Sequence, residues 1–181
     1  AVYSYTVKAY SGSWESGCDY DGVSAMYLSI PKLKKAENAS SGIKITWQEV
    51  PMAETYYVGR RDVGGTWKTI KTIRKSEVKK DSYGQIYYVD TTAVEGKTYN
   101  YSVRAYAKGT SSGYSENRFG TFFPPVDVLS AQNVDGGIKI TWEKSPKATS
   151  YVIWCKADDG SRSEAINVKN VTSYVDKDVT T

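Results

Sequence analysis

Histidine is absent from this sequence of 181 residues, and cysteine occurs only twice. Histidine is the commonest general base and a frequent metal ligand, so its absence removes the usual starting points for catalysis and for zinc binding. The two cysteines, Cys18 and Cys155, are too few for a disulfide framework and lack the spacing of a metal site. No nucleophile elbow or glycine-rich phosphate loop occurs either. We therefore predict that the protein is not an enzyme and has no catalytic residues, no metal and no cofactor.

Long apolar runs and clusters of basic residues are also scarce. No apolar run approaches the roughly 20 residues that a membrane-spanning helix needs, so we expect no membrane span in this chain. The 24 Lys and Arg residues outnumber the 20 Asp and Glu residues by only four, and they are scattered. This distribution argues against a nucleic-acid partner. Apolar residues make up 40% of the chain, with 16 Tyr and 5 Trp, which is enough for a packed core.

One short segment occurs twice and gives the clearest structural signal. Residues 43–47 read Ile-Lys-Ile-Thr-Trp, and residues 138–142 repeat them. Apolar and polar residues alternate in both copies, which is typical of a strand with one buried face. The copies stay in step downstream, with the matches Pro51 and Pro146, Ala53 and Ala148, Tyr56 and Tyr151, and Val58 and Ile153. The chain therefore contains two copies of one β-unit.

Residues 31–124 carry the signals of a complete set of strands. Short alternating segments are separated by turn residues at intervals of about 8–12 residues, which is typical of a β-sandwich. The charged stretch 74–82 fits either a helical turn or a solvated loop. The expected strands cover residues 33–36, 43–47, 55–61, 67–73, 86–90, 99–106 and 117–123.

The two ends of the chain carry only parts of this pattern. Residues 3–10 match residues 99–106, and a second strand is expected over 23–30, so the first 30 residues hold two strands. The two strands in residues 1–30 are too few for an independent domain. Residues 125–181 repeat the first five strands and then stop.

The order of motifs resembles the fibronectin type III family, and most closely the tandem modules of bacterial secreted and cell-surface proteins. The motifs are Gly-Ile-Lys-Ile-Thr-Trp, Pro-x-Ala-x-x-Tyr-x-Val, Gly-x-Trp-Lys-x-Ile, Tyr-x-Asp and Gly-Lys-Thr-Tyr-x-Tyr-x-Val-Arg-Ala-Tyr. The resemblance implies an all-β fold of tandem fibronectin type III-like (immunoglobulin-like) β-sandwiches. It implies that Trp47 and Trp142 are core residues of the second strand, and that Tyr99 and Tyr3 form tyrosine corners in the core. The tripeptide Arg-Gly-Asp is absent, so integrin binding is not expected.

The resemblance also implies three segments. Residues 1–30 correspond to the last two strands (F and G) of one module, residues 31–124 to a complete module, and residues 125–181 to strands A to E of a further module. Three explanations for the incomplete ends stay open. The chain is an excerpt of a longer array, or its two ends stay partly disordered, or residues 125–181 of one molecule pair with residues 1–30 of another. The third would build a homo-oligomer or filament.

The function that we expect is structural: a non-catalytic extracellular spacer or stalk of a bacterial surface or filament protein. Pro31 and the pair Pro124-Pro125 lie between the segments and restrict the backbone, which favours stiff connections. The alternative is an adhesion module that binds carbohydrate or protein, or an accessory domain of a secreted glycoside hydrolase. Asp19 and Asp21 echo the start of a calcium loop, but the later ligands are missing, so a plain turn is expected.

Aromatic residues that we expect to be exposed, at outward strand positions, at the head of a strand or near the loop between the last two strands, are the candidate binding surface for the alternative function. Flat rings stack on sugars or anchor a partner protein. The competing interpretation is ordinary packing between strands, with Lys and Arg side chains covering the rings. The candidates are Tyr57, Trp67, Trp154, Trp14, Tyr106 and Tyr114.

Overall fold

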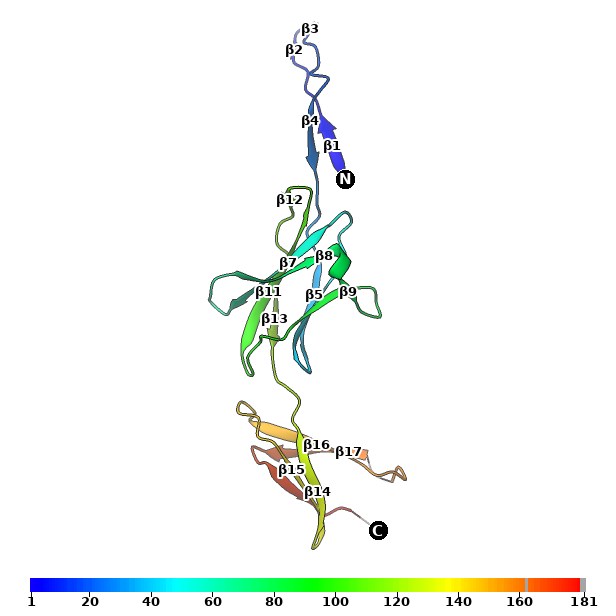
Figure 1. Ribbon diagram of the computed structural model, residues 1–181, viewed down its shortest axis with the longest axis vertical. Coiled ribbons are helices and arrows are strands. Elements are labelled where there is room, and N and C mark those ends of the chain that lie inside the picture. The colour runs from blue at the N-terminus through cyan, green and yellow to red at the C-terminus, as the bar shows by residue number, and fades with distance from the viewer. Residues whose placement is uncertain (162, 180–181) are drawn as a thin grey trace. The chain divides into compact units, whose positions relative to one another are not determined.

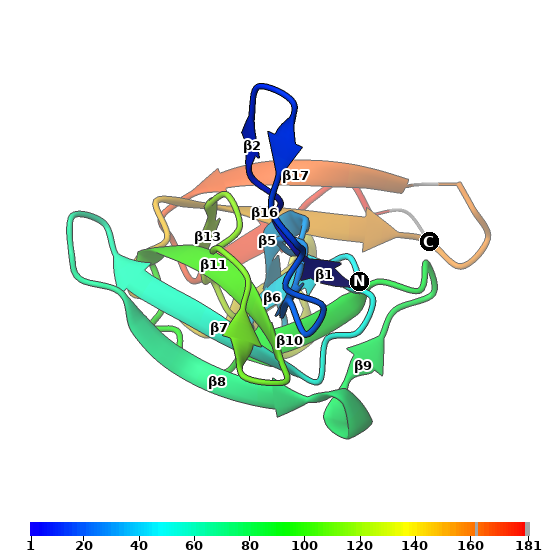
Figure 2. The ribbon, with the colours of Figure 1, turned by 90° about the horizontal axis from the view of Figure 1, so that it is seen from above.

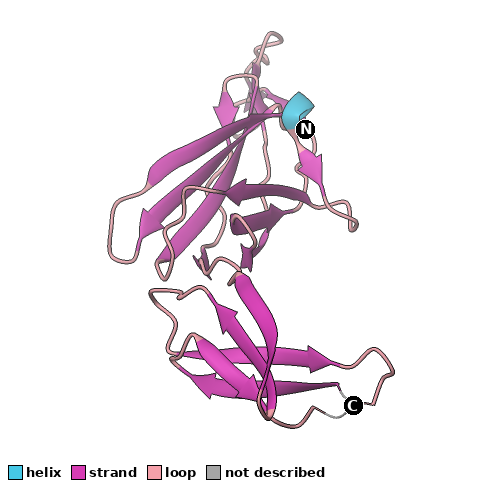
Figure 3. Ribbon diagram, turned by 60° about the horizontal axis from the view of Figure 1, so that its bottom comes forward, coloured by secondary structure: helices cyan, strands magenta, loops and turns pink. Residues whose placement is uncertain are grey.

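The computed structural model describes residues 1–161 and 163–179, and these residues form an almost entirely β structure (Figures 1 and 3). It divides into two compact units, Ala1–Phe123 and Pro124–Thr181. The helical content of the described residues is one 3₁₀ turn, η1 (Lys75–Glu77), drawn in cyan in Figure 3. No helix in the described part of the chain is long and apolar enough to cross a membrane.

The first unit contains a two-sheet sandwich, which we call the central module. One sheet has the order β5-β6-β10-β9, and the other has the order β12-β11-β7-β8, with β13 also paired to β11 (Figure 2). This is the A-B-E and G-F-C-C′ arrangement of a fibronectin type III-like sandwich. The strands are β5 (Leu33–Ala39), β6 (Gly42–Trp47), β7 (Thr55–Asp62), β8 (Lys68–Arg74), β9 (Lys79–Lys80), β10 (Ile86–Asp90), β11 (Thr98–Ala107), β12 (Thr110–Ser111) and β13 (Arg118–Thr121).

Alternating side chains from both sheets fill the core of the central module. From β6, Ile43, Ile45 and Trp47 are fully buried. From β11, Tyr101 and Val103 meet them from the opposite sheet. Each such burial contributes about 1.5–3 kcal/mol. The period of two along each strand therefore determines which residues build this core.

The second unit repeats the first part of this sandwich. Strands β14 (Val128–Val134), β15 (Gly137–Trp142) and β18 (Ser173–Asp176) form one sheet, while β16 (Ser150–Lys156) and β17 (Ser163–Lys169) form another. The rings of Trp47 and Tyr56 lie 5.6 Å apart at 59°, and those of Trp142 and Tyr151 lie 5.5 Å apart at 61°. The two copies of the β-unit therefore share side-chain geometry as well as sequence.

The same glycine contact starts the repeated strand in both units. A Cβ atom on Gly42 would collide with the carbonyl oxygen of Asp90, and one on Gly137 would collide with that of Asp176. Only glycine lets the two neighbouring strands approach this closely. The glycine that precedes each Ile-Lys-Ile-Thr-Trp segment is therefore required by the sheet.

The N-terminal hairpin (residues 1–26) consists of β1 (Val2–Tyr5) paired with β4 (Val23–Met26), and of β2 (Tyr10–Ser11) paired with β3 (Trp14–Glu15). Leu28, just after β4, is buried in the core of the central module. The assignment of residues 1–30 to a partial module of their own stays a prediction.

Several predicted strands differ in extent from the observed ones. The strand expected over residues 3–10 is interrupted after Tyr5, because β1 pairs with β4 on one side and the described residues provide no strand for its other side. Strand β8 begins at Lys68, after Trp67, and the last strand of the central module is limited to Arg118–Thr121. The ambiguous stretch 74–82 contains both η1 and the short strand β9.

Candidate functional site

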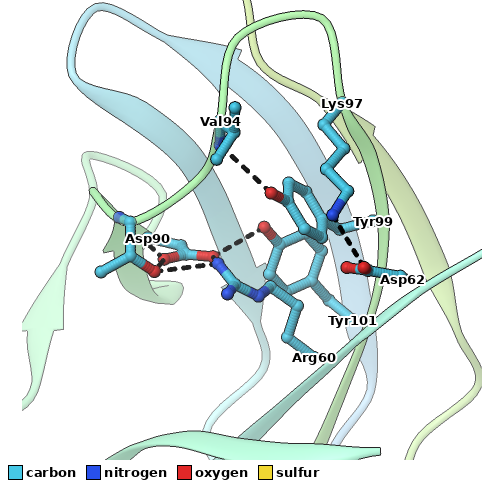
Figure 4. Close-up of polar contacts among 8 residues, drawn as sticks. Arg60, Asp62, Asp90, Val94, Lys97, Tyr99 and Tyr101 are labelled. Atoms are coloured by element: carbon cyan, nitrogen blue, oxygen red, sulfur yellow. Dashed lines mark hydrogen bonds and ion pairs between the residues drawn. The ribbon is translucent and has the colours of Figure 1, made fainter. Parts of the chain in front are cut away.

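A buried carboxylate joins the two sheets of the central module (Figure 4). Asp90, at the end of β10, is fully buried and accepts hydrogen bonds on Oδ2 from Arg60 Nη1 at 2.7 Å and from Tyr101 Oη at 2.8 Å. Its Oδ1 accepts from the backbone N and the Oγ1 of Thr92, at 3.1 and 2.7 Å. Arg60 lies on β7 and Tyr101 on β11, so these bonds connect one sheet to the other.

The environment keeps this carboxylate ionised. Burial by itself would raise the pKa of Asp90, but the hydrogen bonds from Thr92, Arg60 and Tyr101 outweigh it and hold the pKa below its usual range. Burial, together with the charge of Asp90, raises the pKa of the Tyr101 hydroxyl, which therefore stays protonated as a donor. Asp90 thus accepts hydrogen bonds from both Arg60 and Tyr101, and this buried polar network stabilises the contact between the two sheets.

Tyr99 extends this cluster toward the surface. Its hydroxyl accepts a hydrogen bond from the backbone N of Val94 at 3.2 Å, as in a tyrosine corner. The guanidinium of Arg60 lies 4.5 Å from the centre of its ring, and the ammonium of Lys97 lies 5.5 Å away. Lys97 also pairs with Asp62 at 2.7 Å (Figure 4). These contacts fix the loop between β10 and β11.

A second cluster covers the outer face of the β7-β8-β11 sheet, and we call it the arginine–aromatic ladder. It consists of Arg61, Trp67, Tyr114, Arg104, Tyr57 and Tyr106. Arg61 lies 4.8 Å from the ring of Trp67, and Arg104 lies 5.0 and 5.1 Å from the rings of Tyr114 and Tyr57. Tyr57 meets Tyr106 edge to face, with centroids 6.3 Å apart.

Gly59 explains how the ladder stays continuous across β7. A Cβ atom at this position would lie 3.5 Å from the ring of Trp67 and 3.8 Å from that of Tyr114, so both rings lie over the bare backbone. Trp67 is 41% exposed and Tyr114 49% exposed, which leaves ring surface accessible to a ligand. Stacked arginines hold rings in place at little entropic cost. The ladder can therefore either shield the outer face of the sheet from solvent or act as a preformed binding surface.

Four of the six predicted surface aromatics lie in this ladder: Tyr57, Trp67, Tyr106 and Tyr114. The other two belong to other parts of the chain. Trp154 lies on β16 of the second unit and Trp14 on β3 of the N-terminal hairpin, and their side chains are 79% and 80% exposed. The predicted surface is therefore smaller than the list of candidates.

The residues predicted for the core show one departure from expectation. Trp47, Trp142 and Tyr99 are buried, but Tyr3 is 49% exposed. The prediction of a buried tyrosine corner at Tyr3 does not hold within this chain, because no strand of the described residues packs over the inward face of β1. Tyr3 contacts Tyr5, with ring centroids 6.4 Å apart.

The sequence did not predict the arginines of the two clusters, nor Asp90, the carboxylate of the first cluster. Arg104 stands directly opposite Tyr57 in the β11–β7 pairing, and Arg60 stands opposite Tyr101. The available signal for Asp90 was the Tyr-x-Asp motif, which recurs with Asp176. Asp19 and Asp21 form a local turn, in which the backbone N of Asp21 donates to Asp19 Oδ1 at 3.1 Å. In the described part of the chain, no group of three or more Cys, Asp or Glu residues could hold a metal ion.

No protein-family model and no curated protein sequence matches this chain. Among solved structures, a fibronectin type III-like protein from Clostridium thermocellum is 26% identical, with a TM-score of 0.41 over 55% of this chain and 95% of that one. A β-1,2-glucanase from Parabacteroides distasonis is 23% identical, with a TM-score of 0.46 over 55% of this chain but only 13% of the glucanase. A two-domain fibronectin type III segment of chicken tenascin is 11% identical, with a TM-score of 0.40 over 82% of each chain.

The fold assignment rests on the strand order of the chain itself. The A-B-E and G-F-C-C′ sheets, the buried tryptophan of strand B and the tyrosine of strand F together define the class. The central module is a fibronectin type III-like β-sandwich. The assignment of residues 125–181 to strands A to E of a further module stays a prediction.

Proposed function

We propose that this chain is a non-catalytic structural segment of an extracellular bacterial surface or filament protein, in which sandwich units act as spacers. The observation that carries the proposal is the repetition of one structural frame. The Trp–Tyr ring geometry, the glycine at the start of strand B and the aspartate at the end of strand E all recur in the second unit. Repeated modules of this kind add length to a chain, and the fold by itself does not imply catalysis.

The end of the central module supports a stiff connection to the next unit. Asn38 on β5 donates from Nδ2 to the carbonyl oxygen of Phe123 at 2.8 Å, and its Oδ1 accepts from the backbone N of Phe123 at 2.9 Å. This two-bond clamp holds the last residue before Pro124-Pro125. Consecutive prolines restrict their own backbone and that of the residue before them. The clamp and the prolines together limit the freedom of the linker.

Single-molecule fluorescence energy transfer tests the spacer role. The only two cysteines, Cys18 and Cys155, lie in different units and are both free, so the natural chain accepts one dye in each. At nanomolar concentration we expect a narrow distribution of transfer efficiency. The variant Pro124→Gly with Pro125→Gly should broaden it. A wild-type distribution as broad as that of the glycine variant would contradict a stiff spacer.

A second candidate function is ligand binding at the arginine–aromatic ladder. The specific observation is that Trp67 and Tyr114 are held by arginines and by the bare backbone of Gly59 while much of each ring stays exposed. Such a surface suits a carbohydrate, or a protein that presents a flat face.

A glycan array probed with the full chain distinguishes ligand binding at the ladder from a role in which the ladder only shields the sheet from solvent. Binding that is lost in Trp67→Ala but kept in Trp14→Ala would support the ladder as the site. Trp14 is the matched control because its ring is even more exposed but lies on the N-terminal hairpin. Absence of binding to any glycan, or equal loss in both variants, would contradict carbohydrate binding at the ladder.

A further inference from the structure

A polar cavity of about 350 Å³ lies beside the turn that joins β7 to β8 in the central module. The end of β7, this turn, β8 and the start of β11 provide its walls. Four of the side chains that line it are basic: Arg60, Arg61, Lys68 and Lys97. Ligand sites in proteins have volumes of about 300–1,000 Å³. This cavity is at the lower end of that range, so it suits a group as large as a single sugar ring.

Two of the four basic side chains already have acidic partners. Arg60 pairs with the buried carboxylate of Asp90 at 2.7 Å, and Lys97 pairs with Asp62 at 2.7 Å (Figure 4). Asp62 also lines the cavity, where an unpaired carboxylate would repel an anion. Because Lys97 neutralises it, the two ion pairs together add little net charge to the cavity wall.

The other two basic side chains, Arg61 and Lys68, have no acidic partner among the described residues. The guanidinium of Arg61 lies 4.8 Å from the ring of Trp67, and its buried Nε has no hydrogen-bond partner. Lys68 stands opposite Arg60 in the β7–β8 pairing, so its nearest neighbour across the strands is another basic residue. The cavity wall therefore carries two positive charges that the surrounding protein does not neutralise.

The wider distribution of charge strengthens this local excess. Residues 60–80 contain eight Lys and Arg residues but only two Asp and Glu residues. The rest of the chain contains 16 basic and 18 acidic residues, so the excess of positive charge comes entirely from this segment. A surface with charge of one sign raises the local concentration of ligands of the opposite sign. The cavity lies at the beginning of the basic segment and should attract anions.

The cavity also borders the arginine–aromatic ladder. Arg61 belongs to both, and Trp67 lies between Thr66 and Lys68, which line the cavity. The Trp67 side chain is 41% exposed and can pack against the face of a sugar. The hydroxyl of Thr66 and the backbone of Gly65 offer polar groups to the hydroxyls of such a ligand. Positive charge and an aromatic ring are therefore available side by side.

We propose that this cavity binds the carboxylate of an acidic sugar, such as a uronic acid residue of a polysaccharide, with the sugar ring beside Trp67. This inference rests on the second candidate function, carbohydrate binding at the ladder, and names the chemical class of the ligand. The planar guanidinium of Arg61 suits a carboxylate, with which it forms two parallel hydrogen bonds. Lys68 adds a second positive charge. A neutral sugar gains neither interaction.

NMR titration of the full chain with glucuronate, glucose and acetate tests the proposal. Glucose has the same ring without the carboxylate, and acetate has the carboxylate without the ring. We expect glucuronate to bind at least about tenfold more tightly than either, because charge-assisted hydrogen bonds and ring packing act together. The amides of residues 61–68 and the indole N–H of Trp67 should shift. Acetate that binds as tightly as glucuronate would overturn the proposal.

Equal binding of glucose and glucuronate would also overturn it, but would leave the ladder as a carbohydrate site. If neither sugar binds, the acidic-sugar proposal fails. The ladder candidate as a whole fails only if the glycan array also shows no binding. The spacer role does not depend on any of these results, because the fluorescence experiment measures the linker alone.

Charge variants on one strand locate the site. Lys68→Gln should weaken glucuronate binding by about fivefold, the usual effect of losing one charged hydrogen bond at an accessible site, and should leave glucose binding unchanged. The matched control is Lys71→Gln, which makes the same change of charge on β8 but does not line this cavity. Trp67→Ala should weaken the binding of both sugars. An equal loss of glucuronate binding in Lys68→Gln and Lys71→Gln would contradict a specific site in the cavity.

Discussion

The central module and the second unit contain the same strand sequence, Gly-Ile-Lys-Ile-Thr-Trp, but bury it to different degrees. Ile43 and Ile45 are fully buried, whereas Ile138 and Ile140 are partly exposed. The difference is the sheet that lies opposite: β11 and β13 complete the central module, and the second unit has no equivalent of them in its described residues. The alternation of apolar and polar residues therefore determines the strand and its two faces. The burial of the apolar face depends on strands that come later in the sequence.

The largest expected difference between the two units concerns their tryptophans. Trp47→Ala should lower the free energy of unfolding of the central module by about 3–5 kcal/mol, the usual cost of emptying a closed core. Trp142→Ala should cost the second unit less, about 2–3 kcal/mol, because its half-open core can collapse or admit water. Residue-resolved NMR during urea titration at low protein concentration measures each unit separately. Equal costs would show that both cores are closed.

The next largest effect concerns the aspartate at the end of strand E. Asp90→Asn removes the charge that Arg60 and Tyr101 share, and breaking a buried pair of this kind should cost the central module about 3 kcal/mol. Asp176→Asn should cost less, because Cys155 occupies the position of Arg60 in the second unit. The same titration reports both values. A larger loss for Asp176→Asn would contradict the assigned equivalence.

The pKa of Asp90 predicts how the stability of the central module depends on pH. Because hydrogen bonds hold this pKa below the unfolded value of about 3.9, the contribution of Asp90 is fully present above that pH. It is lost as pH falls through the folded pKa. Thermal unfolding between pH 7 and pH 2 should therefore show a steeper acid loss for the wild type than for Asp90→Asn. Parallel curves would rule out this role for the carboxylate.

The smallest expected effect concerns the arginine–aromatic ladder of the central module. Arg104→Ala removes two cation–π contacts near the surface, and these should together contribute about 1 kcal/mol. Lys71→Ala, on the exposed part of β8, is the control and should change stability by less than about 0.5 kcal/mol. If Arg104→Ala changes the free energy of unfolding by no more than this control does, the ladder adds little stability, and this result would favour a binding role.

The strand pattern could be predicted from sequence because period-2 alternation directly reflects a sheet with one buried face. Residues 43–47 and 138–142 therefore predicted the strands of the fold, and the outward register of the third strand predicted Tyr57 as a surface aromatic. The ladder and the Arg60–Asp90 pair could not be predicted, since they depend on which strands become neighbours and in what register. Tyr3 failed as a core residue for a related reason: burial requires a second sheet.

Amide hydrogen exchange measured by NMR tests most directly the central claim, that the two units share one strand pattern but bury it to different degrees. Ile43 and Ile45 are fully buried, whereas Ile138 and Ile140 are partly exposed. The amides of Ile43 and Ile45 should therefore exchange with solvent more slowly than those of Ile138 and Ile140. Equal exchange rates in the two units would contradict the claim.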